Sequence, residues 1–238
     1  MFNIARTSDI PGLITQLRDL NWLSASQQQQ LTTAMVVDKV ERDGVIFSDE
    51  RGAGHDVFIL LSGAARLTAV NGKRRRIVMA LFPPGILRRP PTLSGLSGLR
   101  CEALRASRVA RISRDVVVEV AVGARVPNFD QAATLLYGGL DNLLTRYPGY
   151  TGFDLRARVA NVLLELGAAF GAHNSRGMML TINPTQQDLA DLVGASRPKV
   201  SVVLSEFVRD GAIDREGRHF ALIPSRLEAI VQSRYWTM

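Results

Sequence analysis

The spacing of apolar residues predicts helices at the start of the chain. A first apolar stripe recurs every three positions and consists of Ile14, Leu17, Leu20 and Leu23. Ser24 or Ser26 could then cap a second helix over Gln27–Met35, because a serine hydroxyl accepts hydrogen bonds from the free N–H groups of a first helical turn.

Beyond Val40 the pattern changes to short apolar segments separated by turns. These segments are VIF (45–47), VFILLSG (57–63), ARLTAV (65–70) and RIVMALF (76–82), and CEALRASRVARIS (101–113) predicts two further strands. Asn71-Gly72 is the strongest hairpin signal, since a type I′ turn requires positive φ at both central residues. Strands at this spacing with glycine-rich turns are typical of a small antiparallel β-barrel or roll.

Further along the chain, the apolar spacing is again helical. The stripe consists of Leu135, Leu136, Leu140, Leu143 and Leu144. An amphipathic helix between domains must bury its apolar side, so we expect Leu136, Leu140 and Leu143 to form a dimer interface with a second copy of the chain. Pro148-Gly149 breaks or kinks this helix.

After that break, a second amphipathic helix is predicted over 153–169, with a turn at 173–177. Thr185 is then a candidate N-cap for a helix over Gln186–Val193, with Asp188 as its partner in a capping box. Gly194 follows, where a turn between two crossed helices requires a permissive backbone.

The next predicted helix, Arg197–Asp210, begins with basic and hydroxyl-bearing residues. Ser196 is its candidate cap, and Pro198 lies in the first turn, where a missing N–H costs nothing. The apolar side shared by the two helices consists of Leu189, Val193, Val200, Val203, Leu204 and Phe207. The residues left to face outward are Arg197, Lys199, Ser201 and Ser205.

Two such helices form a helix-turn-helix, whose second helix presents its first residues to base edges in the DNA major groove. We expect Arg197 and Ser201, with Lys199 and Pro198, to read bases, because arginine can contact O6 and N7 of guanine together. GAIDREGRHFALI (211–223) predicts a two-stranded wing. The residues expected mainly to contact phosphates are Thr185, Gln187, Ser196, Lys199 and Arg218.

Composition narrows the possible functions. The net charge of +7 over 238 residues suits an anionic partner, although most of the surplus lies before residue 152. A single cysteine, Cys101, excludes an internal disulfide and an all-cysteine metal site, and the three histidines lie far apart, so we expect no metal and no cofactor. The sequence shows no Ser/His/Asp arrangement and no pair of catalytic carboxylates, so we do not expect an enzyme. With no signal-peptide pattern and no run of 18 apolar residues, we expect a cytoplasmic protein that does not enter the membrane.

Three segments together carry a resemblance to a known family. They are TQQDLADLVGASRPKVSVVLSEF (185–207) with the wing that follows it, GFDLRARVANVLLEL (152–166), and VIFSDERGAGHDVFILLSGAARL (45–67). They resemble the DNA-binding end, the hinge with its following helix, and the cyclic-nucleotide-binding-type β-roll of the CRP/FNR superfamily of bacterial transcription regulators. The resemblance also places a helix near VVVEVAV (116–122), which reads as a strand by propensity alone.

Two departures from that family concern its small-molecule effector. Members that bind cyclic AMP carry a Gly-Glu pair for the ribose hydroxyl and an Arg-Ser/Thr pair for the cyclic phosphate. Here Gly85 is followed by Ile86, and Ser97-Gly98 stands where the Arg-Ser/Thr pair would fall. We therefore expect no response to cyclic AMP. The oxygen-sensing branch of the family needs a cysteine cluster, which one thiol cannot supply.

Three further features leave alternatives open. Cys101 is a redox switch or haem ligand, or, as is commoner, an inward-facing residue of the roll. The basic run 73–76 is a solvated hairpin end, or a contact for an anion or RNA polymerase. Arg88 and Arg89 could bind a phosphate-bearing effector such as a cyclic dinucleotide, or belong to a charged loop without a ligand.

The sequence thus predicts an α+β homodimer that binds double-stranded DNA and regulates transcription. Its parts are an antiparallel β-roll domain (1–125), a dimerisation helix and hinge (126–152) and a winged helix-turn-helix domain (153–238). In the alternative, the protein is a receptor for another anionic small molecule, on which its DNA binding depends. Family members often carry Glu where Pro198 stands and Arg where Val202 stands, so we expect a half-site unlike that of the cyclic AMP receptor protein.

Overall fold

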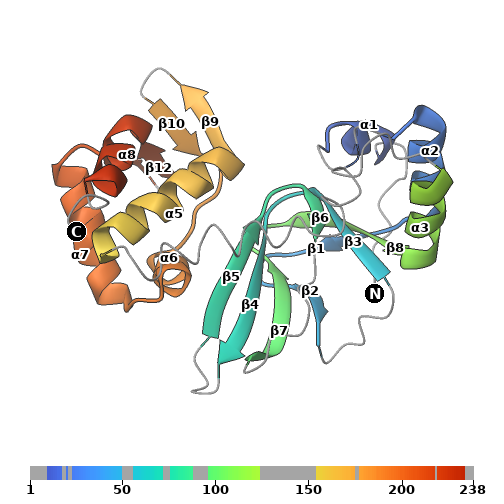
Figure 1. The fold of residues 1–238 in the computed structure, drawn as a ribbon, viewed down its shortest axis with the longest axis horizontal. Coiled ribbons are helices and arrows are strands. Elements are labelled where there is room, and N and C mark those ends of the chain that lie inside the picture. The colour runs from blue at the N-terminus through green and yellow to red at the C-terminus, as the bar shows by residue number, and fades with distance from the viewer. Residues whose placement is uncertain are drawn as a thin grey trace. The chain divides into compact units, whose positions relative to one another are not determined.

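The computed structural model describes residues 10–17, 20, 23–49, 56–71, 76–87, 96–123, 154–174, 177–217 and 219–233. The chain divides into two compact units, whose described parts are 10–123 and 154–233 (Figure 1). The domain boundaries predicted at 125/126 and 152/153 fall outside the described residues, and so do Leu136, Leu140 and Leu143.

The N-terminal unit combines helices with two antiparallel sheets of four strands each. Its helices are α1 (Ile10–Thr15), α2 (Ala25–Ala34) and α3 (Arg114–Gly123). The first sheet has the order β1-β8-β3-β6 and consists of β1 (Val36–Val40), β8 (Ser107–Ser113), β3 (Asp56–Ser62) and β6 (Gly85–Leu87). The second has the order β2-β7-β4-β5 and consists of β2 (Val45–Ser48), β7 (Leu96–Ala103), β4 (Ala65–Asn71) and β5 (Arg76–Phe82). The predicted antiparallel β-roll is confirmed.

The helices cover one face of the first sheet. Alternate residues of β3 and β8 point to this face and are buried with residues of all three helices. That core includes Ile10, Ile14, Leu31, Ile59, Leu61, Ala110, Ile112 and Val120. Phe58 points to the opposite face, where its ring centroid lies 5.2 Å from that of Phe47 on β2. This contact joins the two sheets across the interior of the roll.

The N-terminal apolar stripe is buried as predicted, but only its first part is an α-helix. Helix α1 ends at Thr15. The N–H groups that donate to the carbonyl three residues earlier belong to Leu17, Leu20 and Leu23. Each of these bonds spans three residues, as in the tight turn of a 3₁₀ helix, and not the four of an α-helix. Ser24, and not Ser26, caps α2, and the side chain of Gln27 completes a capping box.

Residues 116–122 are helical, as the family resemblance implied and against their β propensity. Val120 is buried and Val116 packs partly against the same core, whereas Val118 is 50% exposed. The spacing of four between the two packed valines matches a helix lying on the sheet. Packing against the core therefore overrides the strand preference of β-branched residues here.

The C-terminal unit consists of helices around a third antiparallel sheet. Its helices are α5 (Leu155–Phe170), α6 (Gln186–Val193), α7 (Arg197–Arg209) and α8 (Pro224–Gln232). The sheet has the order β11-β12-β10-β9 and consists of β9 (Gly171–Asn174), β10 (Gly177–Leu180), β11 (Ile213–Glu216) and β12 (His219–Leu222). The predicted wing, β11 and β12, is confirmed.

The hairpin of β9 and β10 corrects the sequence analysis, which predicted only a turn at 173–177. Its four-residue strands carry no period-2 pattern that would mark them as strands. β10 has a second partner that is distant in the sequence, since its Met178 and Met179 pair with Leu222 and Ala221 of β12. The wing is therefore part of a four-stranded sheet and not a separate ribbon.

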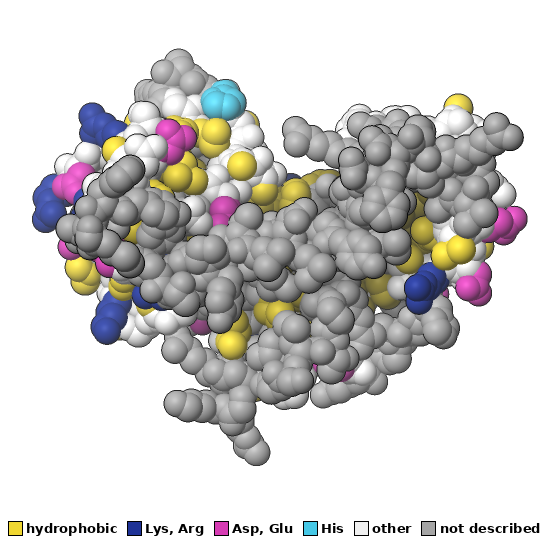
Figure 2. Space-filling model, in the orientation of Figure 1, with side chains coloured by type: hydrophobic (Ala, Val, Ile, Leu, Met, Phe, Trp, Pro, Cys, Tyr) yellow, Lys and Arg dark blue, Asp and Glu magenta, His cyan; other side chains and the backbone are white. Residues whose placement is uncertain are grey.

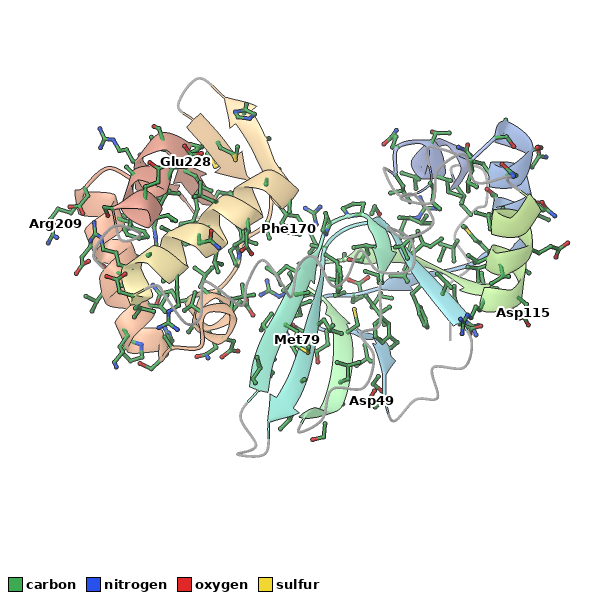
Figure 3. All side chains as sticks on the ribbon, in the orientation of Figure 1. Asp49, Met79, Asp115, Phe170, Arg209 and Glu228 are labelled. Atoms are coloured by element: carbon green, nitrogen blue, oxygen red, sulfur yellow. The ribbon has the colours of Figure 1, made fainter. Side chains whose placement is uncertain are left out.

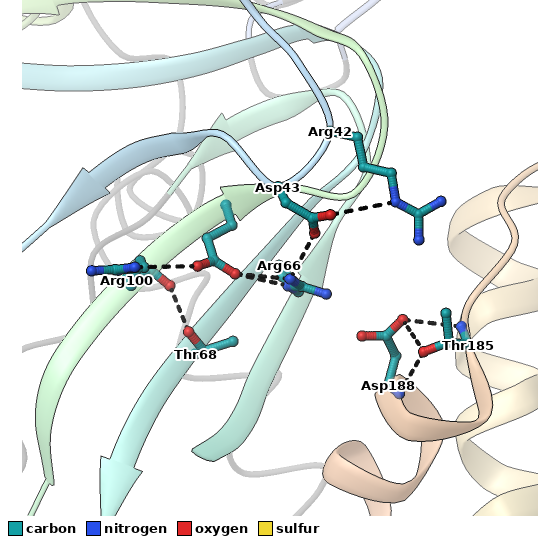
Figure 4. Close-up of polar contacts among 8 residues, drawn as sticks. Arg42, Asp43, Arg66, Thr68, Arg100, Thr185 and Asp188 are labelled. Carbon is teal, nitrogen blue, oxygen red and sulfur yellow. Dashed lines mark hydrogen bonds and ion pairs between the residues drawn. The ribbon is translucent and has the colours of Figure 1, made fainter.

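A buried ion-pair network joins strands of the second sheet to the turn before β2 (Figure 4). Arg66 on β4 and Glu102 on β7 are direct cross-strand neighbours, and their side chains are 10% and 11% exposed. Nε and Nη2 of Arg66 lie 3.0 and 2.9 Å from Oε2 of Glu102. Nη2 also donates to Oδ1 of Asp43 at 2.9 Å, in a turn where Asp43 has a φ of +62°. The guanidinium thus connects two strands and a strained turn.

We expect Arg66→Met to lower the free energy of unfolding of the N-terminal unit by about 3–5 kcal/mol, because Glu102 would keep a buried charge without its main partner. Urea denaturation followed by circular dichroism measures this loss. The double variant Arg66→Met/Glu102→Leu should lose less free energy of unfolding, because it also removes the carboxylate that would be left buried without its partner. Equal losses in the single and double variants would contradict this explanation.

Candidate nucleic-acid interface

The capping box at the start of α6 forms as predicted (Figure 4). Thr185 Oγ1 accepts from the N–H of Asp188 at 3.0 Å, and Oδ2 of Asp188 accepts from the N–H of Thr185 at 3.0 Å. The Thr185 hydroxyl also donates to Oδ2 of Asp188 at 2.7 Å. Its proton is therefore committed inside the box, and its predicted phosphate contact would have to compete with this hydrogen bond.

Gln187, another residue predicted to contact phosphate, is exposed on the same helix. Its Nε2 donates to Oδ1 of Asp191 one turn further on, at 2.7 Å. This bond holds the side chain along α6, but an amide nitrogen has a second hydrogen to donate. Gln187 can therefore keep its position and still contact an acceptor in solvent.

The turn between α6 and α7 is built on Gly194. This residue has φ 66° and ψ 31°, the left-handed conformation that was expected of it. Its N–H and that of Ala195 both donate to the carbonyl of Ala190. From α5, Nη1 of Arg158 donates to the carbonyl of Val193 at 3.0 Å. These bonds satisfy the carbonyls at the end of α6 and fix the direction in which α7 begins.

Ser196 occupies the N-cap position of α7, but its side chain makes no capping hydrogen bond, which corrects the prediction. The physical reason lies two residues further on. A capping hydroxyl accepts from the second or third N–H of a helix, and Pro198 removes the first of these two donors. The side chains of Ser196, Arg197 and Lys199 are exposed at this helix end. The N-terminus of α7 thus has donors available for an anion.

Four residues of α7 face the protein core, as the sequence predicted. They are Val200, Val203, Leu204 and Phe207, and each is at most 7% exposed. On the other side, Arg197, Lys199 and Ser205 are exposed and Ser201 is half-buried. The Ser205 hydroxyl donates to the carbonyl of Ser201 at 3.0 Å. Burial of one side therefore determines which side chains α7 can present to a partner.

Arg156 on α5 holds the C-terminal half of α7 through a contact that was not predicted from the sequence. Nη1 and Nη2 of Arg156 on α5 lie 2.6 Å from Oε2 of Glu206 and 2.5 Å from Oδ2 of Asp210. The same guanidinium lies over the ring of Phe207, 5.1 Å from its centroid. Glu206 and Asp210 are four residues apart, a spacing that places two acidic side chains on one helix face and could have indicated a basic partner.

The contacts with Arg156 also change the pKa of the Asp210 carboxylate. The hydrogen bond from Arg156 and the charges of Arg156 and Arg209 hold the pKa of Asp210 below its usual range. The hydrogen bond to Asp210 likewise raises the pKa of Arg156. The side chain of Arg209 extends outward from the end of α7 and is 74% exposed, although its Nε lies 3.5 Å from Oδ1 of Asp210 (Figure 3).

Charge on the C-terminal unit is mixed. On the face shown in Figure 2, its described Lys and Arg side chains stand apart, with Asp and Glu among them. This face therefore has no broad basic surface among the side chains shown. The candidate wing residue Arg218 lies outside the described residues, next to Gly217, whose φ is +61°.

The candidate effector residues belong to the N-terminal unit. Arg88 and Arg89 lie outside the described residues, as do 73–75 of the basic run. Ile86 lies on β6, paired with Ile59, and Ser97 is exposed on β7. Among the described residues, no group of three His, Cys, Asp or Glu is placed to hold a metal ion. No helix in the same parts of the chain is long and apolar enough to span a membrane.

Cys101 on β7 is buried in the N-terminal unit. It pairs with Leu67 of β4 and Phe47 of β2, whose side chains are also buried. Burial, and to a smaller extent the charge of Glu102, raise the pKa of the Cys101 thiol far above its usual range. This environment suits a packing residue, because the reactive form of cysteine is the thiolate.

These features define a class: a β-roll unit followed by a winged helix-turn-helix unit. Residues 157–230 match the family model described as the Crp-like helix-turn-helix domain. The chain is 40% identical over 65 residues to a CRP-like cAMP-activated global transcriptional regulator of Mycobacterium tuberculosis. That match spans 27% of this chain and 29% of the relative's length.

Solved structures extend the similarity to the whole fold. FixK2 from Bradyrhizobium japonicum matches with a TM-score of 0.66 at 23% identity, over 82% of this chain and 96% of FixK2. The c-di-GMP responsive global regulator CLP of Xanthomonas campestris matches with a TM-score of 0.63 at 18% identity, over 84% of this chain and 99% of CLP. The chain has the fold of the CRP/FNR regulators and carries a Crp-like helix-turn-helix domain, which confirms the resemblance inferred from sequence.

We expect Arg156→Met to lower the Tm of the C-terminal unit at neutral pH, because α7 loses two ion pairs and the contact with Phe207. The pKa of Asp210 is lowered in the folded state, so its stabilising contribution is present above the unfolded pKa, about 3.9 for Asp, and is lost as the pH falls through the folded value. The difference in Tm between wild type and variant should therefore shrink in acid. Thermal melts followed by circular dichroism across this pH range measure it.

Arg209→Met is the matched control, because it removes an exposed guanidinium from the same helix end. It should change Tm much less than Arg156→Met at neutral pH. Equal effects of the two substitutions would show that Arg156 does not hold α7 in place.

Proposed function

We propose that this protein is a dimeric, sequence-specific DNA-binding transcription regulator of the CRP/FNR type. The observation that carries the proposal is the start of α7, where exposed Arg197 and Lys199 flank a helix end without a side-chain cap. This helix end belongs to a helix-turn-helix, and the opposite side of α7 is buried against the rest of the unit. A recognition helix requires this combination of a rigid base and free donors at its first turn.

Within the proposal, the residues of α7 have different roles. Arg197 in the first turn reads a guanine, because its planar guanidinium matches the O6 and N7 acceptors of that base. Ser201, one turn further on, lies beside it as a second base contact. Lys199 and the uncapped hydroxyl of Ser196 are suited to phosphates, which position the helix without specifying sequence. Thr185, Gln187 and Arg218 are further candidates for phosphate contacts.

The dimer follows from the leucine stripe. Leu136, Leu140 and Leu143 would pack against their two-fold mates and place two copies of α7 in successive major grooves of an operator with two half-sites. In this proposal the protein is cytoplasmic and has no catalytic role, and RNA polymerase is a further partner. The CRP/FNR fold, whose structural relatives include named regulators, supports the assignment.

We expect Arg197→Ala to weaken binding to a selected operator far more than binding to scrambled DNA, because one guanine contact is worth about 1–3 kcal/mol of discrimination. Arg218→Ala should weaken both about equally and reduce the slope of log affinity against log salt by about 2 for a dimer, one phosphate per subunit. In vitro selection with the purified protein supplies the operator, and titrations at several salt concentrations measure both variants. Equal losses on the two duplexes for Arg197→Ala would contradict its role in reading bases.

The second candidate function is that of a receptor whose DNA binding depends on an anion other than cyclic AMP. Ile86 and Ser97-Gly98 provide neither a carboxylate for ribose nor a guanidinium for a cyclic phosphate. Arg88 and Arg89 are the candidate contacts for a larger phosphate-bearing ligand. CLP, which shares the fold, is described as responsive to c-di-GMP, and this makes a cyclic dinucleotide the first ligand to test.

We expect calorimetry with millimolar cyclic AMP to show no saturable binding. The matched titration uses a cyclic dinucleotide with wild type and with Arg88→Ala/Arg89→Ala, and operator affinity is measured with and without each ligand. Binding of the dinucleotide that disappears in the double variant and shifts operator affinity supports the receptor. Low-micromolar binding of cyclic AMP would contradict the reading of Ile86 and Ser97-Gly98.

A further inference from the structure

Val202 on α7 is the most exposed of the large hydrophobic residues in the described parts of the chain. Its exposed fraction is 59%, compared with 52% for Val36, 50% for Val118 and 42% for Val208. An isolated exposed valine needs no explanation on most surfaces. This one lies on the helix proposed to enter the major groove, so its side chain faces the place where base edges would lie.

The helical spacing places Val202 near the centre of the outward side of α7. It follows Pro198 by one turn and precedes Ser205 by three residues, so these three residues share a face. The four buried residues of the helix lie on the opposite side. Because the Ser205 hydroxyl donates back to the carbonyl of Ser201, it is already engaged within the helix. The centre of the face around Val202 is therefore largely apolar, with Pro198 on one side of the valine and Ser205 on the other.

An apolar side chain can read only one feature of the major groove. Guanine, adenine and cytosine present hydrogen-bond donors and acceptors there, whereas thymine adds the C5-methyl group. Valine has no group that can donate to a phosphate or accept from a base. Its side chain is also too short to reach from the groove to the DNA backbone.

We propose that Val202 reads the C5-methyl group of a thymine in each half-site, at a position other than that of the base contacted by Arg197. This inference rests on the proposed DNA-binding function and gives it a defined sequence preference. A half-site would then combine a guanine, contacted through hydrogen bonds, with a thymine selected through apolar contact. The outward exposure of Val202 has a function in this arrangement, because DNA binding buries its methyl groups.

The test removes the methyl group from each side of the contact in turn. Each thymine of the selected operator is replaced by deoxyuridine, which pairs identically but lacks the methyl group, and the affinities of wild type and Val202→Ala are measured. For wild type, one thymine per half-site should lose about fourfold in affinity when replaced, the effect of one buried methyl group. Val202→Ala removes the contact from both half-sites of the dimer, so its affinity for the thymine operator should fall about sixteenfold. For this variant, replacement of a thymine at that position should have little further effect.

Val208→Ala is the matched control, since it truncates another exposed valine of the same helix. It should keep the full sensitivity to deoxyuridine. Thermal melts should show that all three proteins are equally folded, because both substitutions are on exposed positions.

The outcomes separate this inference from the proposed function. If no thymine is sensitive in wild type, or if the sensitivity persists in Val202→Ala, the methyl contact is wrong, while operator selectivity that depends on Arg197 still supports the regulator. If wild type shows no preference for any operator over scrambled DNA, the proposed function fails and the methyl contact fails with it.

Discussion

The burial of one side of α7 against its own unit is the constraint on which the candidate interface depends. Val200, Val203, Leu204 and Phe207 leave water almost completely, and each such side chain contributes roughly 1.5–3 kcal/mol of hydrophobic stabilisation. Once these four are inside, the helical period decides which residues face out. The roles that we propose for the remaining side chains depend on that orientation, and so does the exposure of Val202.

Polar contacts fix the position of the helix that burial has oriented. At its start, the left-handed Gly194 and the bond from Arg158 to Val193 set the direction of the chain. At its end, Arg156 holds Glu206 and Asp210 and lies over Phe207. Both arginines belong to α5, so one helix supports both ends of α7. Specific contacts with base edges require this precision, because a small displacement of the backbone would remove them.

The N-terminal unit uses a different solution to join its parts. Its two sheets meet through apolar contacts such as that of Phe47 with Phe58, and its buried guanidinium, Arg66, ties two strands to a turn. The described interior holds a buried thiol, Cys101, among apolar residues.

Local patterns in the sequence determined the helix-turn-helix, because each of its signals acts within a few residues: the Thr185 capping box, Gly194 in the turn and the spacing of apolar residues on α7. Only the tertiary structure decided three other features. Residues 177–180 pair with a distant strand, β12, and residues 171–174 extend the same sheet by pairing with 177–180. Residues 116–122 became a helix because they pack on the core. Arg156 forms an ion pair with Glu206, which lies 50 residues away in the sequence. Contacts between residues far apart in sequence leave no local period, and so the sequence alone could not show them.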